Sequence, residues 1–139
     1  MDFEKRALQT AVTLGCVVPI GAGLSGMVLG PVLSEGAALG PTDLDSHFRY
    51  LSGLLLAVGL GFLSTVPRIE RRGGRFLGLA GIVVVGGLGR LASVLALGLP
   101  SAPMKAALAM ELLVTPALAF WQMRVARLAA ASRTSLAAD

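Results

Sequence analysis

The segment 76–99, FLGLAGIVVVGGLGRLASVLALGL, decides the fold, because Arg90 is its only charged residue. A helix that crosses a bilayer needs about 20 mostly apolar residues, and this segment reaches that length. Three further blocks are also mostly apolar, at residues 7–33, 46–66 and 105–124, and Glu111 is the one charged residue in them that lies more than a helical turn from a block end. The sequence therefore predicts an all-α polytopic membrane protein, in which one membrane domain, residues 1–139, forms a bundle of four transmembrane helices.

The composition supports lipid as the solvent of these blocks. Apolar residues make up 55% of the chain and charged residues 14%, against about 45–50% and about 25% in a typical soluble domain. The charges gather in the gaps between the blocks, so the net charge of +4 needs no nucleic-acid partner to explain it. The single cysteine, Cys16, lies in the first block and excludes an intrachain disulfide.

The basic residues predict an orientation, because lysine and arginine prefer cytoplasmic loops. On one predicted side of the membrane, the only basic residues that flank the spans are Arg49 and Lys105. Both termini and the loop 68–75 are therefore expected to be cytoplasmic, and the loops 34–46 and 101–105 to face outward. Arg71 and Arg72 could also meet anionic lipid, although a topology signal alone is the simpler interpretation. Nine basic residues mark the other side: Lys5, Arg6, Arg68, Arg71, Arg72, Arg75, Arg124, Arg127 and Arg133.

Glycine is abundant, with 18 residues that lie mostly within the spans. Gly26 and Gly30 have GxxxG spacing, and Gly86 and Gly87 lie in the third span. Membrane helices gain little from burying oily side chains against each other, so small residues that allow close backbone approach favour association. We predict that these glycines pack the helices of the bundle, with a dimer face as the alternative.

Two charged residues lie more than one helical turn from the ends of the spans, Arg90 in the third and Glu111 in the fourth. A charge at the bilayer centre costs about 2.5–3.5 kcal/mol on insertion scales, so each needs a partner, a cavity or water. The short connection makes the third and fourth spans antiparallel neighbours. Their depths differ by about 6 Å at 1.5 Å per residue, which an arginine side chain can bridge. The planar guanidinium also suits a carboxylate at two points.

Further polar residues lie toward the same predicted outer half. His47, Arg49 and Tyr50 open the second span, Ser93 lies one turn from Arg90, and Thr115 lies one turn from Glu111. If they converge with the two charges, they form a pocket suited to proton transfer or anion binding. In the alternative interpretation, the pair only joins two helices and the second-span residues lie at the lipid headgroups. No metal site or cofactor is expected, since one histidine without an accompanying cysteine makes a poor ligand set.

The order and spacing of several short motifs resemble a bacterial family of small four-helix membrane proteins, domain of unknown function 4345. The resemblance implies four helices, an inner-membrane location, and a place for His47, Arg49, Arg90 and Glu111 in the family pattern. It implies no activity. The motifs are HFRYLSG at 47–53, PRIE at 67–70, Gly86-Gly87, Arg90, Ser93, GLP at 98–100, Glu111 and Pro116.

Three hypotheses for the function follow. The first is a non-enzymatic structural or accessory subunit, whose glycine faces bind a membrane-protein partner or a second copy. The second is a carrier or binding protein for a small amphiphile, anion or proton-coupled solute, in which the outward polar cluster receives a lipophilic or anionic ligand. The third is an enzyme acting on a lipophilic substrate, with Glu111 or His47 as the acid or base.

Overall fold

The computed structural model describes residues 2–33 and 42–136, and all regular structure in that part of the chain is helical. This confirms the predicted all-α class. Of the loop expected at 34–46, residues 34–41 lie outside the described residues. The elements are α1 (Asp2–Leu29), the 3-10 turn η1 (Gly30–Leu33), α2 (Thr42–Leu63), the 3-10 turn η2 (Val66–Arg68), α3 (Gly73–Leu97), α4 (Ala102–Ala109), the π-helical segment η3 (Met110–Val114) and α5 (Thr115–Leu136).

The described residues include four helical stretches long and apolar enough to cross a membrane: Phe3–Leu29, Thr42–Arg68, Gly73–Leu97 and Ala102–Arg133. They confirm the four predicted spans and identify the chain as a multi-pass membrane protein by length and composition. Only 11–22% of the most apolar window of each stretch is buried within the protein. A soluble domain does not leave that much apolar surface in water, whereas lipid is its natural solvent.

All four helical stretches begin before the predicted spans. Two of the boundary differences have an electrostatic explanation, the start of the second helix and the end of the last. The second helix begins at Thr42, four residues before the predicted start at 46, and carries Asp43 and Asp45 in its first turn. Carboxylates there interact favourably with the positive end of the helix dipole. The last helix continues to Leu136 with Arg133 in its final turn. Its polar end extends beyond the apolar span predicted at 105–124.

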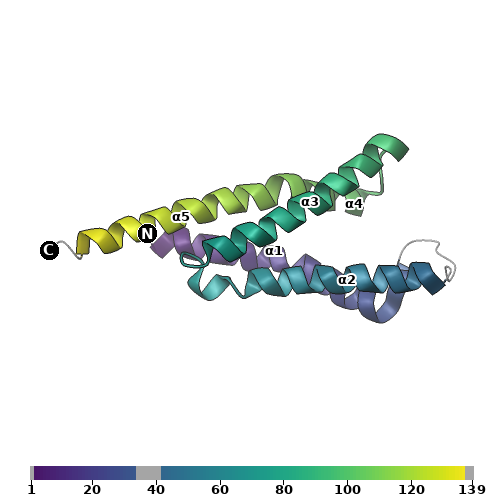
Figure 1. Ribbon diagram of the computed structural model, residues 1–139, viewed down its shortest axis with the longest axis horizontal. Coiled ribbons are helices and arrows are strands. Elements are labelled where there is room, and N and C mark those ends of the chain that lie inside the picture. The colour runs from purple at the N-terminus through teal and green to yellow at the C-terminus, as the bar shows by residue number, and fades with distance from the viewer. Residues whose placement is uncertain (1, 34–41, 137–139) are drawn as a thin grey trace. The chain divides into compact units, whose positions relative to one another are not determined.

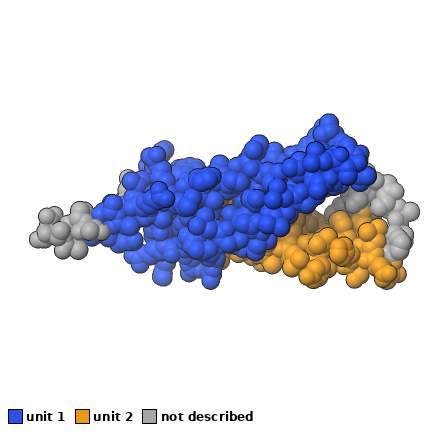
Figure 2. Space-filling view, turned by 45° about the horizontal axis from the view of Figure 1, so that its top comes forward, with its two compact units in different colours: residues 1–9, 67–139 blue, residues 10–66 orange. Residues whose placement is uncertain are grey.

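The chain divides into two compact units (Figure 2), where unit 1 contains Met1–Gln9 and Pro67–Asp139, and unit 2 contains Thr10–Val66. Helix α1 begins in unit 1 and continues into unit 2. The single membrane domain over residues 1–139 stays a prediction.

Glycines bring α1 and α2 close together within unit 2. A Cβ atom on Gly23 would lie 2.6 Å from the backbone nitrogen of Leu56, and one on Gly59 would lie 2.8 Å from the Ile20 side chain. A Cβ atom on Gly26 would collide with the Ser52 hydroxyl, which itself donates to the Phe48 carbonyl at 2.8 Å. The two backbones can approach this closely because these positions carry no side chain.

In unit 1, α3 packs against α5 and η3 (Figure 1). Phe76, Ala80 and Gly87 form the buried side of α3, at spacings of four and seven residues that repeat on one helix face. Gly87 is in close contact with η3, because a Cβ atom there would lie 2.8 Å from Leu112 Cδ2. This close approach sets the distance between the third and fourth spans.

The fourth span contains a π turn just before Pro116. The Thr115 backbone N–H donates to the Met110 carbonyl, five residues earlier, and the Thr115 hydroxyl donates to the same carbonyl at 2.9 Å. Pro116 has no N–H to offer the Leu112 carbonyl, so the regular α-helical ladder is broken there. The interruption at Pro116 takes the form of this π turn, a feature that in other proteins often marks functional positions.

Candidate functional site

The structure pairs the two charges of the third and fourth spans. Arg90 Nε lies 3.0 Å from Glu111 Oε2, and Arg90 Nη2 lies 3.1 Å from Glu111 Oε1. The third guanidinium nitrogen, Nη1, lies 3.0 Å from the Met104 sulfur. The Arg90 side chain is 35% exposed and that of Glu111 20%. The two charges therefore neutralise each other at the protein's apolar surface.

The local backbone explains how these side chains meet. Gly87 lies one turn before Arg90, and a Cβ atom there would come within 2.9 Å of Glu111 Cβ. Glu111 itself lies in the π turn, at its second position. A bare glycine on α3 thus brings η3 close enough for a two-point contact, which is the strong geometry for arginine and carboxylate. The ion pair can join the two helices. Glu111 could interact with another group only after its two-point contact with Arg90 is broken.

Arg49 is engaged with its own chain in unit 2. Its Nε donates to Asp45 at 2.8 Å, and its Nη1 donates to the carbonyls of Met27 and Val28 at 2.7 and 2.9 Å. These carbonyls belong to the last turn of α1, where a basic side chain satisfies free acceptors and the helix dipole. Gly30, which follows, has a φ of +68°, in the left-handed region, and begins the 3-10 turn η1. Arg49 therefore fastens the end of α1 to the start of α2.

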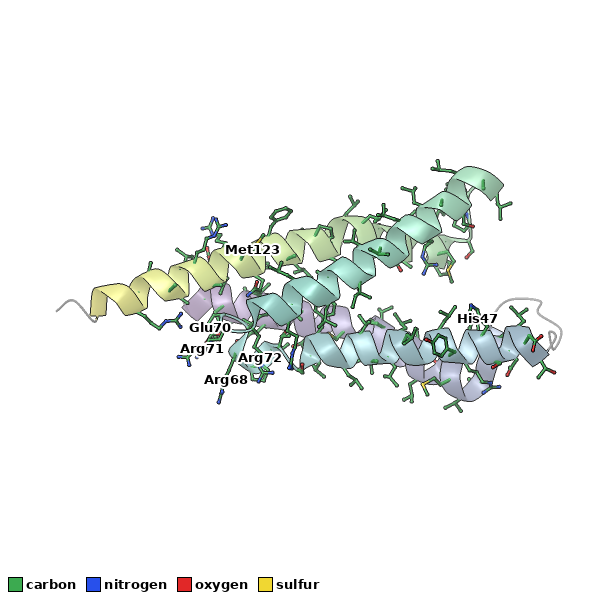
Figure 3. The ribbon with its side chains drawn as sticks, in the orientation of Figure 1. His47, Arg68, Glu70, Arg71, Arg72 and Met123 are labelled. Carbon is green, nitrogen blue, oxygen red and sulfur yellow. The ribbon has the colours of Figure 1, made fainter. Side chains whose placement is uncertain are left out.

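The remaining predicted polar residues differ in their surroundings. His47 is exposed and points away from the α2 ribbon (Figure 3), and Tyr50 is 63% exposed. Ser93 is also exposed, whereas Thr115 closes the π turn. Arg90, Ser93, Glu111 and Thr115 belong to unit 1, and His47, Arg49 and Tyr50 to unit 2. A single pocket formed by both groups stays a prediction. Among the described residues, no three His, Cys, Asp or Glu side chains gather as a metal site would need.

Unit 1 contains an open apolar hollow of about 310 Å³. Lys105 is the one charged residue in its lining, and neither Arg90 nor Glu111 contributes to it. The hollow lies between the end of α3 and the α4–η3 segment. It is lined by Val94, Leu99, Pro100, Lys105, Leu108, Ala109, Leu112 and Leu113.

Sequence reasoning missed a polar network in unit 1. Lys5 pairs with Glu70 at 3.1 Å, and Glu4 pairs with Arg124 at 3.0 Å. Gln122 is fully buried and donates from Nε2 to the Ile69 carbonyl at 2.9 Å. The predicted topology puts all these charges on one side of the membrane. The sequence therefore indicates that such ion pairs are possible. Nothing in the local sequence distinguishes a buried glutamine from an exposed one.

The surroundings of Glu70 favour its charged form. Burial alone would raise the pKa of this carboxyl, but a hydrogen bond from its own backbone, together with Lys5 and Arg71, lowers the pKa below its ordinary value. The carboxylate is therefore a fixed negative charge at neutral pH, held against the start of α1.

The comparisons with known proteins agree with the resemblance noted in the sequence. The model of one family, described as Domain of unknown function (DUF4345), matches residues 7–122. That range includes all four spans, wholly or in large part, and the positions of His47, Arg49, Arg90 and Glu111. No curated protein and no solved structure matches the chain. Because the family model covers most of the sequence, the chain belongs to the DUF4345 family.

Proposed function

We propose that this protein is a small membrane-embedded subunit that binds a helix of a partner membrane protein through one side of α3. We call this side the glycine face and define it as Gly74, Gly78, Gly81 and Gly89. Their spacings of four, three and eight residues bring them to the same side of a helix with 3.6 residues per turn. The buried residues Phe76, Ala80 and Gly87 lie on the opposite side.

The observation that carries the proposal is the open space around these four residues. A Cβ atom on any of them would meet nothing within 4 Å in the described part of the chain. At Gly23, Gly59 and Gly87, by contrast, a Cβ atom would come within 3.0 Å of a neighbour. The glycines in contact have a packing reason within their own unit, whereas those of the glycine face have none within unit 1.

Glycine destabilises a helix relative to alanine, and a glycine face without a packing partner would leave this loss of stability uncompensated. In a helix interior it is about 1 kcal/mol less favourable than alanine, and three such residues, Gly78, Gly81 and Gly89, accumulate along one side of α3. A second transmembrane helix would supply the compensation, because close backbone contact is what small residues contribute between helices in lipid. The face lacks charged residues between Gly78 and Gly89, so it fits an apolar helix better than a polar ligand.

A leucine placed on the glycine face tests the proposal. The double variant G78L/G81L fills the face, and Gly21→Leu is the matched control, because Gly21 is exposed on α1 and equally open. We expect gently purified wild-type protein to carry a second protein in its native mass spectrum. G78L/G81L should lose that mass, and Gly21→Leu should keep it. A lone protomer from wild-type membranes would contradict the proposal, and a homo-oligomer would replace the partner with a second copy.

We also propose the inner membrane of a bacterium as the location, with both termini and the loop 68–75 in the cytoplasm. The distribution of basic residues supports this orientation. Fusing a reporter that is active only in the cytoplasm to the C-terminus tests it. Activity of that fusion is expected, whereas activity only from a fusion within the loop 34–46 would reverse the orientation.

The hollow beside α4 favours a second candidate function, the binding of an anionic amphiphile. An alkyl chain could lie along its leucines, with its carboxylate or phosphate at the open rim, where the ammonium at the end of Lys105 could turn toward it. A pyrene-labelled fatty acid, compared with the corresponding alcohol, is a suitable probe. We expect Ala109→Phe to fill the hollow and abolish binding, Lys105→Gln to remove the preference for the acid, and Ala106→Phe, at an exposed position, to change neither. Equal binding of acid and alcohol by the wild type would exclude this function.

A further inference from the structure

The turn between α2 and α3 is held in place by buried contacts. Ile69 is fully buried, and its carbonyl accepts a hydrogen bond from the buried Gln122 side chain at 2.9 Å. The Arg71 N–H donates to the Arg68 carbonyl at 2.9 Å, which closes the turn. A signal for membrane topology needs positive charge but no fixed shape. The order of this turn therefore calls for a separate explanation.

The same contacts separate positive from negative charge. Glu70 points toward Lys5 and pairs with it at 3.1 Å, with only 13% of its side chain exposed. Arg68 and Arg71 are exposed and project away from the ribbon (Figure 3), while Arg72 is half-buried. Among the described residues, no acidic side chain forms an ion pair with these three arginines. We call Arg68, Arg71 and Arg72 the basic turn.

We infer that the basic turn is a binding site for the phosphodiester headgroup of an anionic phospholipid. Guanidinium groups bind phosphate oxygens at two points, and several of them on one turn can surround one headgroup. The turn joins the spans that end at Arg68 and begin at Gly73, which places it at headgroup depth. Attraction to an anionic membrane surface corresponds to about fivefold in binding for each arginine. This inference is independent of the partner proposed for the glycine face.

A charge-matched comparison in detergent tests the inference. The variant R68Q/R71Q/R72Q removes the basic turn, and R6Q/R127Q/R133Q removes the same charge from three exposed arginines elsewhere in unit 1. The purified proteins are titrated with phosphatidylglycerol or phosphatidylcholine, and bound lipid is counted in native mass spectra. Because no bilayer is present, an altered topology in the cell cannot change the result.

We expect the wild type to prefer phosphatidylglycerol over phosphatidylcholine by more than tenfold. The basic-turn variant should lose more than tenfold in phosphatidylglycerol binding, and the control variant less than threefold. Equal losses in both variants would reduce the effect to net charge and overturn the site. A final titration adds inorganic phosphate to the protein with bound lipid. If phosphate displaces the lipid at millimolar concentration, the site binds free phosphate and the lipid assignment is wrong.

Discussion

The guanidinium of Arg90 and the carboxylate of Glu111 meet at two points, with nitrogen–oxygen distances of 3.0 and 3.1 Å. They are the charged residues inside the apolar parts of the third and fourth spans, and each removes the other's need for water. The π turn that contains Glu111 and the bare backbone at Gly87 make the contact possible. The pair is thus a joint between the third and fourth spans, whatever else it does.

Removing one member of this pair should destabilise the protein more than removing both. Arg90→Leu or Glu111→Leu leaves a charge without its partner among apolar side chains, at an expected cost of about 2.5–3.5 kcal/mol. In the double variant no charge remains, so its free energy of unfolding should exceed that of either single variant. Unfolding in a neutral detergent, analysed as a double-mutant cycle, measures this. Additive losses would show that the two groups do not interact.

Adjacent glycines on α3 should respond to alanine in opposite ways. At Gly87 the new methyl group would come within 2.8 Å of Leu112 and 2.9 Å of Glu111, and overpacking of this kind costs about 1–3 kcal/mol. At Gly86 it would meet nothing within 4 Å, so Gly86→Ala should gain up to about 1 kcal/mol from helix propensity. Melting temperatures of the two variants in detergent provide the comparison. A Gly87→Ala protein as stable as Gly86→Ala would argue against the close contact of α3 and η3.

Gly30→Ala should loosen the junction of α1 and α2. The φ of +68° costs an alanine about 1–2 kcal/mol, and its methyl group would come within 2.6 Å of both Arg49 Nη2 and Asp45 Oδ1. We expect lower thermal stability and faster proteolysis between the two helices. Gly21→Ala, on the open side of α1, is the control and should match or exceed the wild type. Wild-type behaviour of Gly30→Ala would exclude the left-handed turn.

The pKa of Glu70 predicts an acid-sensitive part of the stability. Because folding lowers this pKa, the contribution is complete above the unfolded value of about 4.3 and disappears as the pH falls through the lower folded pKa. Glu70→Gln should therefore melt below the wild type at neutral pH, and the gap should close in strong acid. Melting temperatures of both proteins from about pH 7 to pH 3 measure the gap. If the difference in melting temperature widens on acidification, folding raises the pKa of Glu70 instead of lowering it.

The sequence predicts the four spans well, because long apolar runs in a chain with few charges permit little else. It also indicates the pairing of Arg90 with Glu111, since a short connection makes their helices antiparallel neighbours and leaves each charge one obvious partner. The start of the second helix at Thr42 could also be predicted, because the two aspartates of its first turn are typical of a helix N-terminus. These features depend on local composition, which a single sequence contains.

Other features depend on the folded chain and could not be predicted. Pro116 indicates that the helix is disturbed, but the choice of a π turn depends on how Thr115 and Met110 pair. Arg49 resembled a ligand residue, and only the fold brings it to the carbonyls of Met27 and Val28. Gln122 carries no local sign of burial. Likewise, the glycine count alone does not separate those used in packing, such as Gly87, from those of the glycine face.

Photo-cross-linking from the glycine face tests the central claim most directly. A photoreactive amino acid at Val85, which lies between Gly81 and Gly89 and is 68% exposed, should cross-link to a second protein in native membranes. The same group at Val18 of α1, 69% exposed, is the control and should yield lipid adducts alone. If Val85 also gives only lipid adducts, or cross-links only to residues 10–66 of its own chain, the glycine face is not a partner site and the proposed function is wrong.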